Sequence, residues 1–238
     1  MLPRAILFDL DDTILKAYGG QQEAWLSVAT EFASELAPLS PHEAATAITA
    51  FSQAFWLNAD PQWRMRLQEA RRQVVTGSFA ALAKAGRPTP PPGLARRLAD
   101  RLSAYREEQM SLFPDALEVI DGLRARGTRL GLVTNGAAAL QRAKILRFDL
   151  AHRFDHIQIE GEHGFGKPEE RAYRHALRAL DVEARETWMV GDNLEWEVVA
   201  PQRLGIYAIW FDPAGKGLPE GSSVRPDRIV GRLSELLR

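Results

Sequence analysis

The feature that most constrains the fold is a regular alternation of strand and helix patterns, which begins near residue 113 and continues to the end of the chain. Short apolar runs mark the predicted strands at 5–10, 129–133, 154–159, 187–190, 206–210 and 229–230. Helical periodicity predicts helices at 115–126, 137–147, 169–180 and 194–204, between these runs. Strands that alternate with helices form a parallel sheet with helices on both faces. The predicted fold class is therefore α/β, a doubly wound parallel-sheet (Rossmann-like) core.

A long helical stretch interrupts this pattern directly after the first predicted strand. Residues 16–112 lack strand signals and carry apolar residues at helical spacing, which predicts four or five helices. The proline-rich segment 87–93 predicts a stiff connector between two of them. Because the stretch falls inside the α/β pattern, we predict an inserted α-helical cap domain at 16–112 and a core made of 1–15 and 113–238.

Charge and composition exclude several classes of function. The 30 basic and 31 acidic residues give a net charge of −1, so neither nucleic acid nor an anionic membrane is an expected partner. The absence of cysteine excludes thiol catalysis and a cysteine-zinc site. No apolar run approaches the roughly 20 residues that span a bilayer. We therefore expect a cytoplasmic protein, and the sequence leaves its oligomeric state open.

The first predicted strand ends in a pair of acids, Asp9 and Asp11, followed by Asp12 and Thr13. Residues two apart in an extended chain lie on the same side, so the two carboxylates repel unless a cation or a shared proton joins them. Such a pair suits Mg²⁺, which prefers oxygen ligands, and a division of labour between a nucleophile and an acid/base. A solvated acidic turn after a strand would show the same pattern.

The strand predicted at 129–133 is followed by Thr134, Asn135 and Gly136. Thr134 offers a hydroxyl, and the next two residues offer backbone N–H groups at the start of a helix, where anions bind. An Asn-Gly pair is also a strong hairpin signal. The helical periodicity of 137–147 argues against a hairpin here.

Two further motifs stand before helices. Lys167 lies in a Gly-Phe-Gly-Lys-Pro segment, and Pro168 suits the first position of the following helix. The lysine could hold a phosphate and reduce carboxylate repulsion, although a flexible turn with an exposed lysine fits the pattern equally. Asp192 follows the strand at 187–190 and suits either a metal ligand or a helix N-cap.

The order Asp-x-Asp-Asp-Thr, apolar-Thr-Asn-Gly, Gly-Lys-Pro and Gly-Asp resembles the haloacid dehalogenase superfamily of hydrolases. Each motif is weak alone, but four in this order, each at a strand end or a helix start, are specific. The resemblance covers residues 1–15 and about 113–238. The insertion resembles the α-helical cap of the phosphatase branch of that family.

This resemblance implies the catalytic roles. Asp9 would attack phosphorus and form an aspartyl-phosphate. Asp11 would protonate the leaving alcohol and then activate water. Thr134 would hold the transferring phosphoryl group together with the backbone of Asn135 and Gly136, and Lys167 would neutralise its charge.

The resemblance also implies a Mg²⁺ cofactor, held by Asp9, by the main-chain carbonyl of Asp11 and by Asp192. One position departs from the family pattern. Family members commonly carry an aspartate five residues after the one that matches Asp192, whereas this chain has Glu197 preceded by Trp196. Glutamate keeps the charge but reaches one methylene further, so we expect an altered outer metal shell at this position.

The predicted function is hydrolysis of a small phosphorylated metabolite by a phosphoric monoester hydrolase. A 2-haloacid dehalogenase would also use an aspartate nucleophile, but Asp11 argues against it because a halide leaving group needs no acid. A phosphosugar mutase is a third candidate enzyme, and a non-catalytic phosphate-binding or signalling module is a candidate from a different class. The sequence does not name the substrate.

Overall fold

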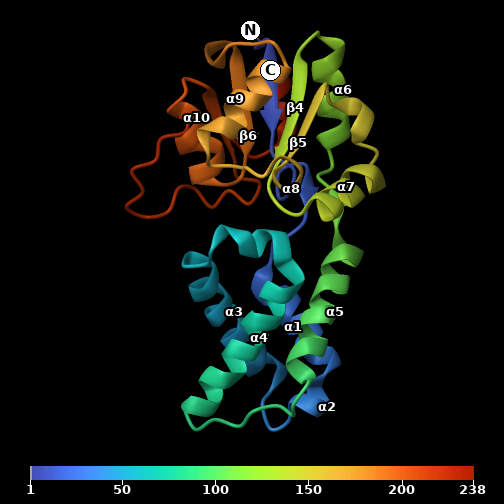
Figure 1. Cartoon of the computed structure of the whole chain (residues 1–238), viewed down its shortest axis with the longest axis vertical. Helices are drawn as coiled ribbons and strands as arrows, with labels where there is room; N and C mark the ends of the chain where they lie inside the picture. Colours follow the sequence, from blue (N-terminus) through green and yellow to red (C-terminus); the bar gives the residue numbers. More distant parts are fainter. Residues whose placement is uncertain (1) are drawn as a thin grey trace. The chain divides into compact units, whose positions relative to one another are not determined.

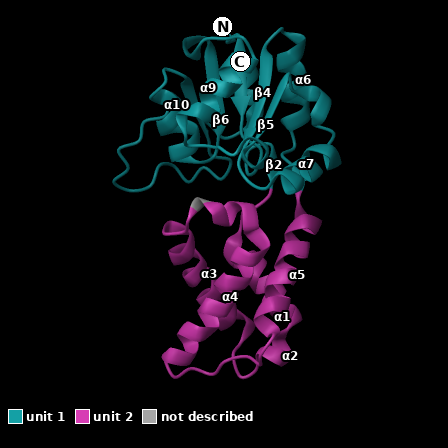
Figure 2. Ribbon diagram, viewed as in Figure 1, with its two compact units in different colours: residues 1–16, 111–238 teal, residues 17–110 magenta. Residues whose placement is uncertain are grey.

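The computed structural model describes residues 2–238 and divides into two compact units. Unit 1 comprises residues 1–16 and 111–238, and unit 2 comprises residues 17–110 (Figure 2). The proposal that residues 16–112 act as a cap for a core stays a prediction. Among the described residues, no helix has the length and apolar character needed to cross a membrane.

Unit 1 contains a six-stranded sheet whose strand order is β5-β4-β1-β6-β7-β8, with every neighbouring pair parallel (Figure 1). The strands are β1 (Ala5–Phe8), β4 (Arg129–Thr134), β5 (His156–Ile159), β6 (Thr187–Gly191), β7 (Tyr207–Phe211) and β8 (Arg228–Val230). The helices of this unit are α6 (Ala116–Ala125), α7 (Ala138–Arg147), α8 (Glu160–His163), α9 (Glu170–Ala179) and α10 (Ala200–Gln202). The predicted fold class is confirmed.

β1 forms the centre of this sheet because all four of its residues are apolar and completely buried. Alternate side chains of a strand point to opposite faces. Ala5 and Leu7 pack in one cluster with Tyr173 and Ala176 of α9. Phe8 points to the other face and makes an edge-on ring contact with Phe154. A strand covered on both faces reads as a continuous apolar run, as this one does.

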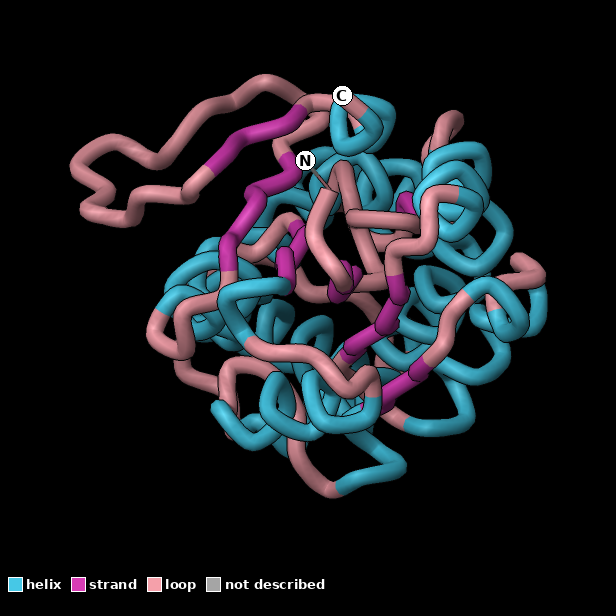
Figure 3. Tube along the Cα trace, turned by 90° about the horizontal axis from the view of Figure 1, so that it is seen from above, coloured by secondary structure: helices cyan, strands magenta, loops and turns pink. Residues whose placement is uncertain are grey.

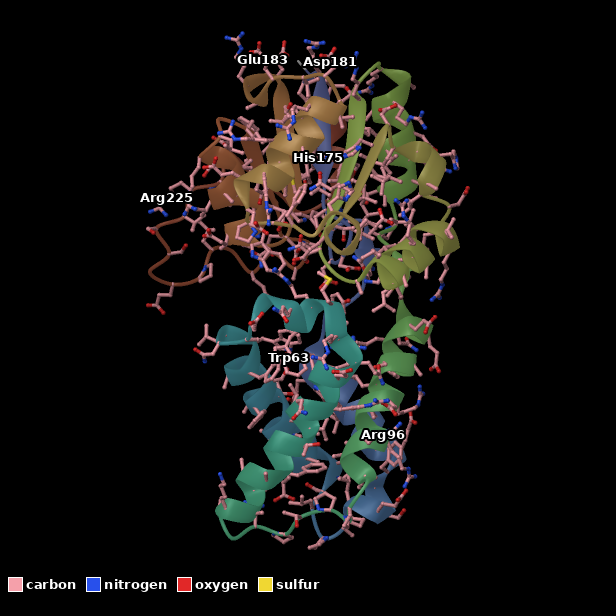
Figure 4. All side chains as sticks on the ribbon, viewed as in Figure 1. Trp63, Arg96, His175, Asp181, Glu183 and Arg225 are labelled. Atoms are coloured by element: carbon pink, nitrogen blue, oxygen red, sulfur yellow. The ribbon has the colours of Figure 1, made fainter. Side chains whose placement is uncertain are left out.

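The order in which the chain adds strands to the sheet changes side at β1, and this switch point determines the position of the site. From β1 the chain passes to β4 and β5 on one side, and then to β6, β7 and β8 on the other. Ligands of open α/β sheets bind beyond the carboxyl ends of the strands at such a switch. Asp181 and Glu183, labelled in Figure 4, precede β6 and therefore mark the opposite edge of the sheet.

Unit 2 is helical, as its sequence predicts. Its helices are α1 (Gln21–Glu31), α2 (Ala33–Leu36), α3 (Pro41–Leu57), the 3₁₀ helix η1 (Pro61–Arg66), α4 (Leu67–Lys84) and α5 (Leu94–Gln109). Ser40 and Glu43 form a capping box that starts α3, with the Glu43 N–H donating to Ser40 Oγ at 3.2 Å. Trp25 of α1 lies in the apolar core of this unit. The proline-rich segment 87–93 joins α4 to α5 as predicted.

Several local features differ from the sequence-based expectation or were not predicted. A small antiparallel pair, β2 (Leu15–Lys16) with β3 (Ser111–Leu112), lies where the chain leaves and re-enters unit 1. The helix expected at 194–204 is a π-helical turn, η4 (Leu194–Val199), followed by the short α10. The long segment 212–227 between β7 and β8 is loop, and Figure 3 shows it in pink between the two strands.

Candidate active site

Three strand ends bring the predicted residues together in unit 1. Phe8 of β1 pairs with Leu132 of β4 and with Val190 of β6. The residues that follow these positions therefore lie side by side at one edge of the sheet. The predicted residues at this edge are Asp9, Asp11, Thr134 and Asp192.

Asp9 is almost completely buried, with 7% of its surface exposed. Its Oδ1 lies 2.5 Å from Lys167 Nζ, and its Oδ2 accepts a hydrogen bond from Thr13 Oγ1 at 3.2 Å. Its backbone N–H donates to the Val190 carbonyl at 3.0 Å. Burial raises the pKa of the Asp9 carboxyl, and the Lys167 ammonium offsets part of this rise. The carboxylate is thus held in one orientation by a cation and a hydroxyl.

Lys167 has no exposed surface and contacts two carboxylates, Asp9 at 2.5 Å and Glu197 Oε1 at 2.8 Å. Burial alone would lower the pKa of this lysine, but the two carboxylates outweigh it and raise the pKa above its ordinary value. Lys167 is therefore a fixed cation at the end of β1. The exposed flexible lysine that the sequence left open is excluded.

Glu197 lies on the π-helical turn and reaches Lys167 across Gly191. The side chain is 1% exposed, and its Oε2 accepts from the Asn193 N–H at 2.8 Å. A Cβ atom on Gly191 would lie 2.0 Å from Glu197 Cγ, so the side chain can cross the end of β6 only over a glycine. π-Helical turns are frequent at functional sites. Glu197 therefore pairs with Lys167 in the core of the site.

Gly191→Ala is expected to move Glu197 away from Lys167 and to lower the free energy of unfolding by about 1–3 kcal/mol, the usual cost of overpacking. The measurement is urea unfolding. Gly19→Ala is the control, because nothing lies within 4 Å of a Cβ at Gly19. Equal stability of the two variants would contradict the close approach of Glu197 to Gly191.

Asn135 fixes the loop that carries Lys167. Its Nδ2 donates to the Lys167 carbonyl at 2.6 Å, and its Oδ1 accepts from the Lys167 N–H at 2.9 Å. The following helix, α9, begins at Glu170, so Pro168 lies before the helix and not at its first position as the sequence suggested. The two hydrogen bonds from Asn135 hold Lys167 and its neighbours in a loop.

Gly136 adopts a left-handed backbone conformation with φ of 121°, and its N–H donates to Glu160 Oε2 at 3.0 Å. Glu160 is buried at the start of α8, a short helix that the sequence did not reveal. The use of the Asn135 and Gly136 backbone as phosphate donors stays a prediction, since the Gly136 N–H already has an acceptor.

Asp11 and Thr134 meet side chains that the sequence did not single out. Lys144 Nζ lies 2.7 Å from both oxygens of Asp11. Gln141 Nε2 donates to Asp11 Oδ2 at 3.0 Å and to Thr134 Oγ1 at 2.5 Å. Both residues lie on α7 three positions apart, on one face of the helix. That spacing is the only signal the sequence carried.

Carboxyl groups outnumber cations in the site. Burial raises the pKa of Asp192 to about 8, and the nearby carboxylates of Asp9, Glu197 and Asp12 add to the rise while Lys167 opposes it. Burial likewise raises the pKa of Glu197 to about 7, against the effect of Lys167. An acidic site with so little neutralising charge suits a divalent cation.

The predicted metal ligands fit this chemistry. Across residues 2–238, no group of three or more histidine, aspartate or glutamate side chains is arranged to hold a metal. The predicted Mg²⁺ ligands include only two side chains, Asp9 and Asp192, and the main-chain carbonyl of Asp11 is the third donor. All three are oxygen donors, the type that Mg²⁺ prefers.

Comparison with known proteins identifies the family. The profile of haloacid dehalogenase-like hydrolases matches residues 3–205, and the chain belongs to this family. It is therefore an enzyme of the hydrolase class, as the four motifs predict.

Two relatives and a solved structure illustrate the similarity. A ribulose-1,5-bisphosphate 5-phosphatase of Halopiger xanaduensis is 33% identical over 88% of this chain and 85% of its own length. A phosphoserine phosphatase of Thermus thermophilus is 41% identical over 61% of this chain, a match that spans only 57% of that relative. The Bacillus subtilis protein YfnB, in a crystal structure bound to magnesium, shares the fold with a TM-score of 0.70 at 23% identity, over 99% of this chain and 97% of its own. Structures of 2-haloacid dehalogenases share the fold as well.

Proposed function

We propose that the chain is a Mg²⁺-dependent phosphatase that hydrolyses a small phosphorylated metabolite through an aspartyl-phosphate on Asp9. The observation that most supports this proposal is the buried Asp9 carboxylate, which lies 2.5 Å from the equally buried Lys167 Nζ. A carboxylate fixed beside a fixed cation suits attack on a phosphoryl group, where positioning and charge neutralisation dominate catalysis. Both relatives described above are named as phosphatases.

In the first step, an Asp9 oxygen forms a bond to phosphorus and the bond from phosphorus to the leaving oxygen breaks. Asp11 gives a proton to that oxygen, which departs as an alcohol. Lys167 neutralises charge on the transferring group, and the Thr134 hydroxyl holds one of its oxygens.

In the second step, water attacks phosphorus and the bond between phosphorus and the Asp9 oxygen breaks. Asp11, now ionised, takes the proton from water. The products are inorganic phosphate and the original Asp9 carboxylate. An alkyl phosphate releases a basic alkoxide and needs the acid in the first step, whereas a halide does not. The presence of an acid/base residue at position 11 therefore favours a phosphatase over a dehalogenase.

Asp9, Asp192 and the Asp11 carbonyl would hold the Mg²⁺ ion. When bound, it would supply charge neutralisation to the transferring phosphoryl group. EDTA is expected to reduce turnover by at least about a hundredfold, and excess Mg²⁺ should restore it. Mg²⁺ should also raise the melting temperature of the wild type but not that of Asp192→Asn, because an ion that binds only the folded state stabilises it. Undiminished hydrolysis in EDTA would contradict the metal requirement.

Release of inorganic phosphate from a panel of phosphorylated metabolites tests the function. Phosphoserine, ribulose 1,5-bisphosphate and glyceraldehyde 3-phosphate belong in it, since relatives are named for them. Chloride release from 2-haloacids is the matched assay for the dehalogenase. Chloride release without phosphate release would overturn the proposal. Because the four motifs all lie in unit 1, we further propose that unit 2 contributes to the choice of substrate.

A further inference from the structure

Two side chains of α7 contact the proposed acid/base and the proposed phosphate-holding hydroxyl at once. Gln141 is 2% exposed, and the side chains of Lys144 and Asp11 are 11% and 16% exposed. These contacts lie within unit 1, between the ends of β1 and β4 and the helix that follows β4. None of the four sequence motifs includes either residue.

The hydrogen-bond chemistry of Gln141 fixes the direction of each bond. A carboxylate accepts only, so the amide nitrogen of Gln141 must face Asp11, and its two N–H groups are divided between Asp11 Oδ2 and Thr134 Oγ1. The Thr134 oxygen is therefore an acceptor in this contact. Its single hydrogen must point to a different acceptor, and a phosphoryl oxygen is the one that the proposed function supplies.

Lys144 contacts both oxygens of the Asp11 carboxylate. Its ammonium lies 2.7 Å from Oδ1 and from Oδ2, so together with Gln141 it holds the carboxylate by three contacts. Charge-assisted contacts of this kind are stronger than neutral hydrogen bonds.

We propose that Gln141 and Lys144 are positioning residues: Lys144 fixes the Asp11 carboxylate, and Gln141 ties it to the Thr134 hydroxyl. The group that moves the proton and the group that holds the phosphoryl oxygen then keep a constant separation while water attacks the aspartyl-phosphate, the step in which Asp11 is ionised. The inference rests on the proposed function. It adds two residues with different positioning roles to the proposed site.

The different roles of Lys144 and Gln141 predict different kinetics with 4-nitrophenyl phosphate, whose leaving group needs no acid. Lys144→Met should leave attack by Asp9 intact and slow the attack of water, so stopped-flow should show a rapid burst of one nitrophenolate per active site. The steady-state rate should fall about tenfold to a hundredfold, as expected for loss of a contact to a charged group. Gln141→Met should slow the burst itself by about tenfold, because Thr134 loses its donor.

Hydrolysis of an alkyl phosphate extends the test, because both of its steps need Asp11. Lys144→Met should reduce its turnover about tenfold to a hundredfold, and Lys144→Arg should recover much of the loss. Arg142→Met is the control, since Arg142 lies on the same helix and pairs with Glu162 at the surface. The rate constant of a burst does not depend on how much protein is folded, so partial unfolding cannot imitate a change in the burst rate.

Several outcomes would overturn the inference. One is a Lys144→Met variant with the wild-type steady-state rate, or with a burst rate and a steady-state rate that fall by the same factor. Another is a Gln141→Met variant with the wild-type burst rate. A wild type that hydrolyses neither ester would overturn the proposed function and the inference with it. If the wild type is active and the variants are unaffected, the inference is overturned but the proposed function is not.

Discussion

Asp9→Asn is expected to abolish the covalent intermediate and to reduce turnover by about four orders of magnitude or more, as loss of a catalytic nucleophile does. The amide has no anionic oxygen with which to attack phosphorus. Rapid quenching during turnover of 4-nitrophenyl phosphate, followed by mass analysis of the Asp9 peptide, measures the adduct directly. The wild type should carry phosphate on Asp9, and the variant should carry none.

Asp11→Asn is the matched control for this experiment. It leaves Asp9 and Lys167 in place, so attack on an ester with an acidic leaving group should continue. The adduct should then persist, because water lacks its base. An adduct on the Asp9→Asn protein, or a wild type that never carries phosphate on Asp9, would contradict the assignment. Direct attack by water would then be the better mechanism.

The sequence predicted the fold and the proximity of the residues of the proposed site because one topological rule connects them. Asp9, Thr134 and Asp192 each follow or end a strand of a parallel sheet, so the order of motifs alone predicts that they meet at one edge. Lys167 was predicted from its motif, and its Nζ lies 2.5 Å from Asp9. No detail of packing was needed for these predictions.

The parts of the site that the sequence did not reveal depend on side-chain direction and on local irregularity. Gln141 and Lys144 face Asp11 only because α7 is turned with that face toward the site, which tertiary packing decides. The π-helical turn that contains Glu197 has no periodic signature distinct from an α-helix. Glu160 lies on a helix of four residues, which is too short to show periodicity.

The histidines show the same limit of pattern-based inference. Their spacing in the sequence gives no sign that any of them lie together. Three of them nevertheless gather in unit 1: the ring of His175 lies 5.3 Å from that of His156 and 4.8 Å from that of His163, centroid to centroid. They come from β5, α8 and α9. Contacts between separate elements leave no trace in local spacing.

Lys167→Met is expected to cost about 3–5 kcal/mol of the free energy of unfolding, the usual effect of removing one partner from a buried ion pair. The loss of the ammonium leaves two buried carboxylates, Asp9 and Glu197, without their common cation. Repulsion between them adds to the cost of burying each one. Urea unfolding measures the change. Activity should also be lost, because the transferring phosphoryl group no longer has the lysine charge that neutralises it.

Lys216→Met is the matched control, because Lys216 is exposed in unit 1 and the same atoms are removed. It should change stability by less than about 0.5 kcal/mol. Adding Glu197→Gln to Lys167→Met should recover part of the lost stability, since one of the two unpaired charges is removed, without restoring activity. Equal stability of Lys167→Met and Lys216→Met would show that Lys167 does not stabilise the two carboxylates. Restored activity in the double variant would show that catalysis does not require the Lys167 charge to neutralise the phosphoryl group.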